Sequence, residues 1–368
     1  MLRFTQHDTK IFSAQASDGI DAAPLVSIVI PHLRGREILF RCLEALRVGT
    51  GHALSLQIVV VDNASDDGSV QAAQVAFPEI IVLRASKNLG FAGACNWGIR
   101  ETLSEFIVLL NDDAEVTPGW LEPLLDCMRS DETIAAGQPK LLAIDPRDAF
   151  DYAGACGGHL DVFGFPLSRG RIFQTIEKDA GQYDDATDVF WATGACMLLR
   201  RSALQMTGLL DEDFFAHMEE IDLCWRLHLA GYRVRVVPAS IVRHQSGSTL
   251  QQQAPQKVYL NHRNSLTMLL KNYGGLSLLR IFPLRLLFEL MAGVYYVAKV
   301  DIKSAAAVMR AFCAVLWRLP AILRKRARIQ QWRVCSDRAL RKRFYRRSIV
   351  LDYFVLGRRS FAGLRSKK

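Results

Sequence analysis

The sequence lacks several patterns that would assign it to familiar classes of protein. Its eight cysteines are scattered without a Cys-x-x-Cys pair, so we expect free, mostly buried thiols in a reducing cytosol. The first residues contain no continuous apolar segment, so no signal peptide is expected. The glycines at 90, 93 and 98 do not follow the G-x-G-x-x-G spacing, which disfavours a dinucleotide site of the NAD type.

Negative charge is scarce at one end of the chain. Residues 321–368 contain 16 Lys or Arg and only two Asp or Glu, a net charge of +14, whereas the preceding 320 residues carry −5. A slightly acidic body with a basic tail predicts an anionic partner at that end only. With 50% hydrophobic and 23% charged residues over 368 positions, the chain is expected to fold as one large or two moderate globular domains.

Apolar runs and helical spacing alternate in the first third of the chain. We predict strands over 25–30, 56–61, 80–83 and 106–110, and a helix over 37–48 between the first two. Polar loops follow the strands, which is typical of a parallel, doubly wound sheet. The first 23 residues are polar and are predicted to be a flexible lead-in.

The next part of the chain is less regular. Longer loops are expected between about 137 and 187, followed by a strand over 190–199. Residues 214–231 are predicted to form a helix that ends at a glycine, and 232–237 a further strand.

Three polar residues follow the strand over 106–110, and the chain is organised around them. Asn111, Asp112 and Asp113 would lie at the carboxyl end of a buried strand, where open α/β sheets bind ligands. Two adjacent carboxylates repel each other unless a cation or hydrogen-bond donors lie between them, and oxygen ligands suit Mg²⁺ or Mn²⁺. The alternative is an ordinary turn in which these side chains only cap the backbone.

Six motifs in this order resemble the inverting nucleotide-sugar glycosyltransferases of family 2, which have the GT-A fold. The nearest resemblance is to bacterial rhamnosyltransferase-like members that build surface polysaccharides. The motifs are Val26-Ser-Ile-Val-Ile-Pro31, Val60-Val-Asp62-Asn63-Ala-Ser65, Asn88-Leu-Gly90-Phe-Ala, Leu109-Leu-Asn111-Asp112-Asp113, Thr193-Gly194-Ala and Glu219-Glu220-Ile-Asp222-Leu-Cys-Trp-Arg226. The resemblance implies an α/β fold with a mostly parallel twisted sheet flanked by helices, over about residues 24–250.

The resemblance also implies a site for a nucleoside diphosphate sugar, linked to dTDP or UDP. The residues concerned are Pro31 and Asp62 at the base, Asn88, Gly90 and Asn96 along the nucleotide sugar, and Asp112 near the ribose. Asp113 would bind the metal, Mg²⁺ or Mn²⁺, and in part of the family a histidine at the position of His244 completes the metal site or contacts the diphosphate. Two departures are visible: Asn111 replaces the first acid of the D-x-D, and His32 replaces the usual threonine after the first strand.

Glu220 holds the position of the family's catalytic carboxylate and is predicted to be the base that deprotonates the acceptor hydroxyl. Its neighbours Glu219 and Asp222 are expected to raise its proton affinity by like-charge repulsion and to contact the acceptor. The alternative is an acidic first helical turn that only complements the helix dipole. Trp191 is predicted to form the floor of the acceptor pocket. The alternative, that it is a tryptophan of the hydrophobic core, agrees equally well with the sequence.

From about residue 251 to 368 we predict a helical, basic region. Apolar residues at 284, 287, 288, 291, 295 and 298 share one helix face, away from Arg285, Glu289 and Lys299, which suits a helix lying on an anionic membrane. No window is free of charge over the about 18 residues that a membrane span needs. The alternative is a helical bundle packed on the catalytic domain or on a second subunit, which leaves a homo-oligomer open; no nucleic-acid module is recognised.

We therefore expect a metal-dependent inverting glycosyltransferase that transfers a sugar, with rhamnose suggested by the resemblance, to a hydroxyl of a glycan or lipid-linked acceptor. It would act in the cytoplasm, peripheral on the inner face of the cell membrane, in cell-surface polysaccharide biosynthesis. Two other functions are considered. A sugar nucleotidyltransferase also combines an α/β sheet with metal-binding carboxylates, and a non-catalytic scaffold of a membrane glycan-assembly complex would retain the fold without the chemistry.

Overall fold

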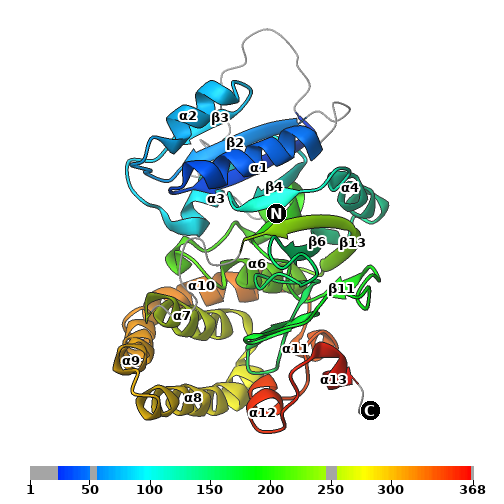
Figure 1. The fold of residues 1–368 in the computed structure, drawn as a ribbon. Coiled ribbons are helices and arrows are strands. Elements are labelled where there is room, and N and C mark those ends of the chain that lie inside the picture. The colour runs from blue at the N-terminus through cyan, green and yellow to red at the C-terminus, as the bar shows by residue number, and fades with distance from the viewer. Residues whose placement is uncertain (1–23, 50–55, 246–254, 366–368) are drawn as a thin grey trace.

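The computed structural model describes residues 24–49, 56–245 and 255–365, and Figure 1 shows how they are arranged. A large mixed sheet has the strand order β11-β13-β6-β12-β4-β1-β2-β3, with β5 paired to β13. Its strands are β1 (Val26–His32), β2 (Leu56–Asp62), β3 (Ile81–Arg84), β4 (Phe106–Leu110), β5 (Ala114–Val116), β6 (Ile134–Ala143), β11 (Thr187–Val189), β12 (Cys196–Arg200) and β13 (Arg233–His244). The predicted α/β fold class is confirmed.

The four strands β3, β2, β1 and β4 run parallel, so their carboxyl ends meet at one edge of the sheet. All five residues of β4 are apolar and buried, because both faces of this central strand are covered. β12 continues the sheet antiparallel to β4, and β13 lies parallel to β6.

Helices cover both faces of the sheet, and neighbouring residues of β1 point to opposite sides. Ile28 and Ile30 join the apolar cluster under α1, α2 and α4, whereas Val29 joins the cluster under α3 and α6. The helices of this part are α1 (Arg36–Gly49), α2 (Ser69–Ala76), α3 (Gly90–Arg100), α4 (Leu121–Ser130), α5 (Arg201–Thr207), the short 3₁₀ helix η2 (Glu212–Phe214) and α6 (Glu219–Leu229). A side chain at Gly98 would collide with Val29, so this glycine permits the close contact of α3 with β1.

The region expected to contain long loops is more ordered than the sequence pattern indicated. β6 extends to Ala143, and a small antiparallel sheet follows, with the order β10-β9-β8-β7. Its strands are β7 (Gly158–Leu160), β8 (Pro166–Ser168), β9 (Arg171–Ile172) and β10 (Thr175–Ile176). Strands of two or three residues are too short to show an alternating pattern in the sequence.

The C-terminal part is helical, and α7 packs on α6 of the sheet-containing part as well as on α9 and α10 (Figure 1). Its helices are α7 (Pro255–Asn272), α8 (Gly275–Ala298), α9 (Ile302–Trp317), α10 (Leu319–Trp332), α11 (Asp337–Leu340), α12 (Ile349–Phe354) and α13 (Phe361–Arg365). Among the described helices, α8 alone is long and apolar enough by composition to cross a membrane, and α9 and α10 reach that length only together, bent by 65°.

Candidate active site

The carboxyl ends of β1 and β2 bring the predicted base-binding residues together. Pro31 and His32 pair with Val61 and Asp62 in the parallel ladder. Asp62 is almost completely buried, and its Oδ1 accepts a hydrogen bond from the backbone N–H of Ser65 at 2.8 Å. The predicted contact with a nucleoside base stays a prediction, but the side chain is held rigidly at the edge where ligands bind.

His32, one of the two departures from the family pattern, connects three loops of the site. Its Nδ1 lies 2.7 Å from Oδ2 of Asp112 and its Nε2 lies 2.7 Å from Oγ of Ser69. Burial raises the pKa of Asp112, and the hydrogen bond from His32 opposes that rise. Asp112 is thereby fixed beside the end of β1. Sequence reasoning noticed this histidine but gave it no role.

Asp113 and His244 converge as the prediction of a metal site requires. His244 Nε2 lies 2.9 Å from Oδ1 of Asp113, while its Nδ1 lies 3.0 Å from Oδ1 of Asp151. A carboxylate behind the second ring nitrogen is the usual support of a metal-binding histidine. Burial alone would lower the pKa of His244, but Asp113 and Asp151 raise it to about 10, and a bound cation would displace that proton.

The residues present therefore fit a divalent cation with an incomplete protein shell. Within the described residues, no group of three or more His, Cys, Asp or Glu side chains surrounds a common metal position. Mg²⁺ and its relatives are commonly bound by one or two protein ligands, with substrate phosphates and water completing the shell. Asp113 and His244 would supply those two ligands.

The loop before α3 is organised by its own amide side chains. Asn88 Oδ1 accepts hydrogen bonds from the backbone N–H of Gly90 at 2.8 Å and from Asn63 Nδ2 at 3.1 Å. Asn96, in contrast, is buried and binds the segment before η2: its Nδ2 donates to the carbonyl of Leu210 at 2.8 Å, and its Oδ1 accepts from the N–H of the same residue. Asn88 and Gly90 remain placed for a nucleotide sugar, whereas Asn96 has a structural role here.

The helix predicted over 214–231 begins later than expected, at Glu219, because the residues before it have unusual backbone angles. Phe215, His217 and Met218 all have positive φ, between 66° and 73°. Non-glycine residues in this region are strained, and such strain is frequent at functional sites. The bend brings Phe215 against Gly90, where any side chain would overlap with it.

Glu220 lies at the start of α6, against the turn that precedes β12. A side chain at Gly194 would contact the Cβ of Glu220, and the next residue, Ala195, accepts a hydrogen bond from the N–H of Asn111 at 3.0 Å. The candidate base is thus adjacent to a turn that is bonded directly to the Asn111–Asp113 segment.

The carboxyl groups of Glu219 and Glu220 lack some of their hydrogen-bond partners in the part of the chain that the structure describes. One oxygen of each, Oε2, is buried without a hydrogen-bond partner among the described residues. Burial raises the pKa of Glu220 to about 7, although backbone hydrogen bonds oppose the rise. The proton affinity of Glu220 is raised as expected, but the cause is desolvation and not the predicted repulsion by Glu219 and Asp222. Repulsion by Glu220 and Asp222 contributes, after burial, to the raised pKa of Glu219.

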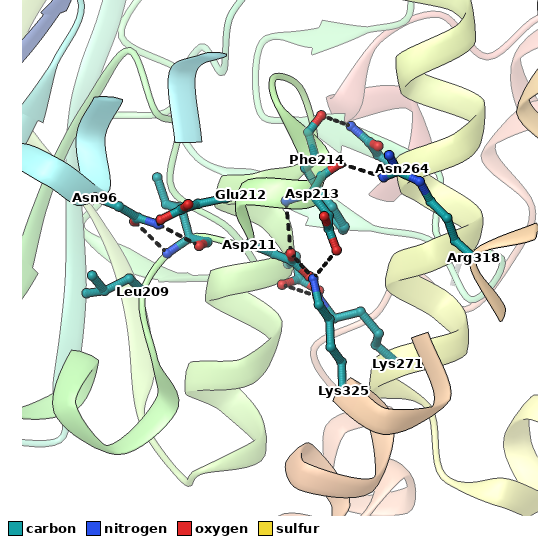
Figure 2. A network of polar contacts seen from close by, with 12 residues as sticks. Asn96, Leu209, Asp211, Glu212, Asp213, Phe214, Asn264, Lys271, Arg318 and Lys325 are labelled. Atoms are coloured by element: carbon teal, nitrogen blue, oxygen red, sulfur yellow. Dashed lines mark hydrogen bonds and ion pairs between the residues drawn. The ribbon is translucent and has the colours of Figure 1, made fainter. Parts of the chain in front are cut away.

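The strained segment is held by α7, from the C-terminal region. Asn264 Nδ2 donates to the carbonyls of Phe214, Ala216 and His217 at 3.0, 2.9 and 2.7 Å. Arg263 Nη2 donates to the carbonyls of Asp213 and Phe214. Figure 2 shows Asn264 directed at Phe214. Residues about 50 positions further along the chain therefore fix the turn that places Glu220.

A buried ionic cluster ties the same two regions together (Figure 2). Lys271 of α7 and Lys325 of α10 both bind Asp211, and Lys325 also binds Asp213 at 2.6 Å. Burial alone would raise the pKa of Asp211, but the two ammonium groups bring it well below its ordinary value.

Asp222 and Trp191, both predicted to contact the acceptor, lie inside the protein. Asp222 is fully buried, with Arg226 Nε at 2.9 Å, Lys271 Nζ at 3.0 Å and Asn272 Nδ2 at 2.9 Å from its oxygens. Trp191 is 2% exposed and donates its indole N–H to a backbone carbonyl. These surroundings assign both side chains to the framework of the site. Of the predicted acceptor residues, Glu219 alone keeps an oxygen unpaired.

The sheet, the carboxylate turn and the buried acids define a nucleotide-sugar glycosyltransferase with the GT-A fold. Residues 27–207 match the family model of Glycosyl transferase family 2.

Similar proteins agree with this assignment. An N-acetylglucosaminyl-diphospho-decaprenol L-rhamnosyltransferase of Mycobacterium tuberculosis is 28% identical over 69% of this chain and 86% of its own length. An O-antigen biosynthesis protein, RfbC, of Myxococcus xanthus is 25% identical over 65% of this chain, which spans only 19% of that protein. The structure of GalNAc-T7 with UDP, GalNAc and Mn²⁺ has a TM-score of 0.55 at 18% identity, over 67% of this chain and 48% of that one, and it supports the fold.

Proposed function

We propose that this glycosyltransferase works with inversion and with a divalent metal, transferring rhamnose from dTDP or UDP to a hydroxyl of a glycan or lipid-linked acceptor. The observation that carries the proposal is the placement of Glu220. Glu220 keeps one buried carboxylate oxygen unpaired among the described residues, and its Cβ lies beside the turn that is bonded to Asn111, at the sheet edge that also holds Asp113 and His244. The names of the mycobacterial and myxococcal relatives support the choice of sugar and pathway.

Each group then has one task. Glu220 accepts the proton of the acceptor hydroxyl as its oxygen attacks the anomeric carbon, and the pKa near 7 suits that proton transfer at neutral pH. Asp113 and His244 would hold the metal, which when bound would supply positive charge near the departing diphosphate. Asp62, Asn88 and Gly90 orient the donor. The burial of Glu219 and of one oxygen of Glu220 limits the access of water, which would otherwise hydrolyse the donor.

The test is a panel of nucleoside diphosphate sugars, assayed for transfer with and without Mn²⁺. We expect transfer from one dTDP- or UDP-linked sugar and its loss in Glu220→Gln, with nucleotide binding retained. Unchanged function of Glu220→Gln in cells would favour the non-catalytic scaffold. Release of pyrophosphate from a nucleoside triphosphate would favour the nucleotidyltransferase.

We also infer that the protein lies on the inner face of the cell membrane through α8. The helix has its polar side inward: Arg285 and Glu289 are buried and paired with each other, and Glu289 also binds His262 of α7. Its apolar side chains face outward, with Leu276, Leu279 and Leu290 between 63% and 75% exposed. Because Arg285 and Glu289 pack against the protein, we place α8 along the membrane surface and not across it.

Two further observations support a membrane as the partner of this face. The apolar surface continues from α8 to α12, where the rings of Tyr295 and Phe354 lie 6.4 Å apart and Val355 is 70% exposed. Exposed arginines at 346, 347 and 359 lie in the same basic tail, which suits anionic lipid. Flotation with vesicles with and without anionic lipid tests the inference, and binding to neither kind would overturn it.

A further inference from the structure

Two basic side chains from distant parts of the chain converge on one tyrosine. The guanidinium carbon of Arg171, on β9, lies 4.3 Å from the ring centroid of Tyr152, and Nζ of Lys257, on α7, lies 5.4 Å from the same centroid. Both cations therefore contact a single aromatic ring, and they are close enough for the charge of Arg171 to lower the pKa of Lys257. Contact with a ring face offsets part of the cost of removing a cation from water, but it does not neutralise its charge.

Neither cation has a carboxylate partner among the described residues. Arg171 is 8% exposed, its Nη1 donates to the carbonyl of Phe173 at 3.2 Å, and its Nε is buried without a partner. Burial lowers the pKa of Arg171, and Tyr152 and Asp151 only partly offset this effect. Burial and then the charge of Arg171 lower the pKa of Lys257. Adjacent desolvated cations are unfavourable unless an anion joins them.

A third nitrogen, on His217, lies close enough to Lys257 for the charge of that lysine to affect its pKa. His217 Nε2 is buried without a hydrogen-bond partner in the described part of the chain. Burial, followed by the charge of Lys257, lowers the pKa of His217 to about 4, so its ring is neutral at physiological pH. A neutral imidazole can donate one hydrogen bond, and its positive-φ backbone is held by Asn264.

The cluster is connected to both halves of the candidate active site. Tyr152 follows Asp151, whose carboxylate supports His244 and through it Asp113. His217 precedes Glu219 by two residues. The chain thus links the cluster to the candidate metal ligands through Tyr152 and to the candidate base through His217.

We propose that Arg171, Lys257 and His217 form an anion subsite that binds a phosphate group of a substrate. The proposal rests on the proposed function, because glycosyl transfer from a nucleoside diphosphate offers phosphate at this place. The phosphate belongs either to the donor diphosphate or to a diphosphate that links the acceptor glycan to its lipid. Arg171 offers its charge and the N–H of its unpaired Nε, Lys257 a point charge and His217 one donor, a set that matches the oxygens of a diphosphate.

The first experiment measures the affinity for inorganic pyrophosphate by calorimetry, with a chelator present so that no divalent cation contributes. Arg171→Gln and Lys257→Gln are each expected to weaken binding by about tenfold or more, since each removes one charge-assisted contact. Arg171→Lys, which keeps the charge, should retain part of the affinity. Lys178→Gln is the matched control, because Lys178 is exposed and paired with Asp148. Thermal melting of every variant reports folding.

The second experiment distinguishes the two sources of phosphate. If the subsite holds the donor, the variants raise the dissociation constant of the nucleoside diphosphate about tenfold and leave that of the nucleoside unchanged. If it holds the acceptor, donor binding stays constant, and KM rises for a lipid-diphosphate acceptor but not for a phosphate-free glycoside.

The proposal is overturned if the folded wild type does not bind pyrophosphate, or if Arg171→Gln and Lys257→Gln bind it as tightly as Lys178→Gln does. The proposed function fails independently, when the wild type binds pyrophosphate through these residues but transfers no sugar from any nucleotide donor.

Discussion

Replacement of Glu220 by glutamine tests the candidate base most directly, because the structure predicts opposite effects on activity and stability. A positioned general base contributes about 10²-fold to 10⁴-fold to the rate, and the amide cannot accept the proton. With a pKa of about 7, the ionised fraction of Glu220 rises roughly tenfold between about pH 6 and about pH 8. The wild-type kcat/KM should rise accordingly, and the residual rate of Glu220→Gln should not.

The same substitution should stabilise the protein at alkaline pH. The folded-state pKa of Glu220 is raised, so its contribution to stability is complete below the unfolded value near 4.5 and is lost as the pH rises through about 7. The rise corresponds to at most about 3 kcal/mol, and to less because solvent reaches part of the side chain. Glutamine removes this penalty, so the variant should melt at a higher temperature than the wild type near pH 8 and at a similar one near pH 4.

The control is the substitution Glu122→Gln. Glu122 is an exposed acid in the first turn of α4, so its replacement should leave the pH profiles of activity and of stability unchanged. The assay combines initial rates of transfer with denaturant melts across the pH range. A Glu220→Gln enzyme that keeps the wild-type pH profile would refute the assignment of the base. One that loses activity together with stability at every pH would show a structural role.

Other predictions follow from the contacts between the two regions. Asn264→Ala should lower kcat with little change in nucleotide affinity, and it should cost about 2 kcal/mol of stability because buried carbonyls lose their donor. Initial rates of transfer together with calorimetry would measure these effects, and an unchanged kcat would contradict the prediction. Lys271→Met should destabilise the fold by about 2 to 3 kcal/mol in denaturant melts, since Asp211 and Asp222 each lose one of their two cationic partners. Asp113→Asn should abolish stimulation by Mn²⁺, and equal stimulation would exclude Asp113 as a ligand. Leu287→Glu with Leu290→Glu should reduce flotation with anionic vesicles without changing the melting temperature.

Patterns of apolar and polar residues in the sequence predicted the helices and strands whose formation depends on neighbouring residues. The apolar run from Phe106 to Leu110 forms β4 with the predicted ends, because both faces of the strand are covered. The expected helix over 37–48 and strand over 56–61 correspond to α1 and β2 within one residue at each end. The turn at Asn111–Asp113 was recognisable because polar residues end such a buried run abruptly.

The features that sequence reasoning missed all depend on residues far apart in the chain. His32 binds Asp112 from 80 positions away, and Asn264 forms the turn before Glu219 from 47 to 50 positions away. The helical pattern that starts at residue 214 does not indicate that Phe215, His217 and Met218 have positive φ. Their strained backbone is stabilised by the side-chain amide of Asn264, which lies far away in the sequence. Burial of Glu220, which raises its pKa, likewise comes from the assembled fold and not from its acidic neighbours.

The hydrogen bonds from Asn264 to the segment before α6 have a practical consequence for the construction of chimeras between related transferases. A chimera that takes its helices from another protein after residue 255 carries a foreign residue at position 264. The borrowed α7 then decides how the turn that places the candidate base Glu220 is held. Acceptor preference and turnover would then change together, even though every nucleotide-binding residue had been left in place.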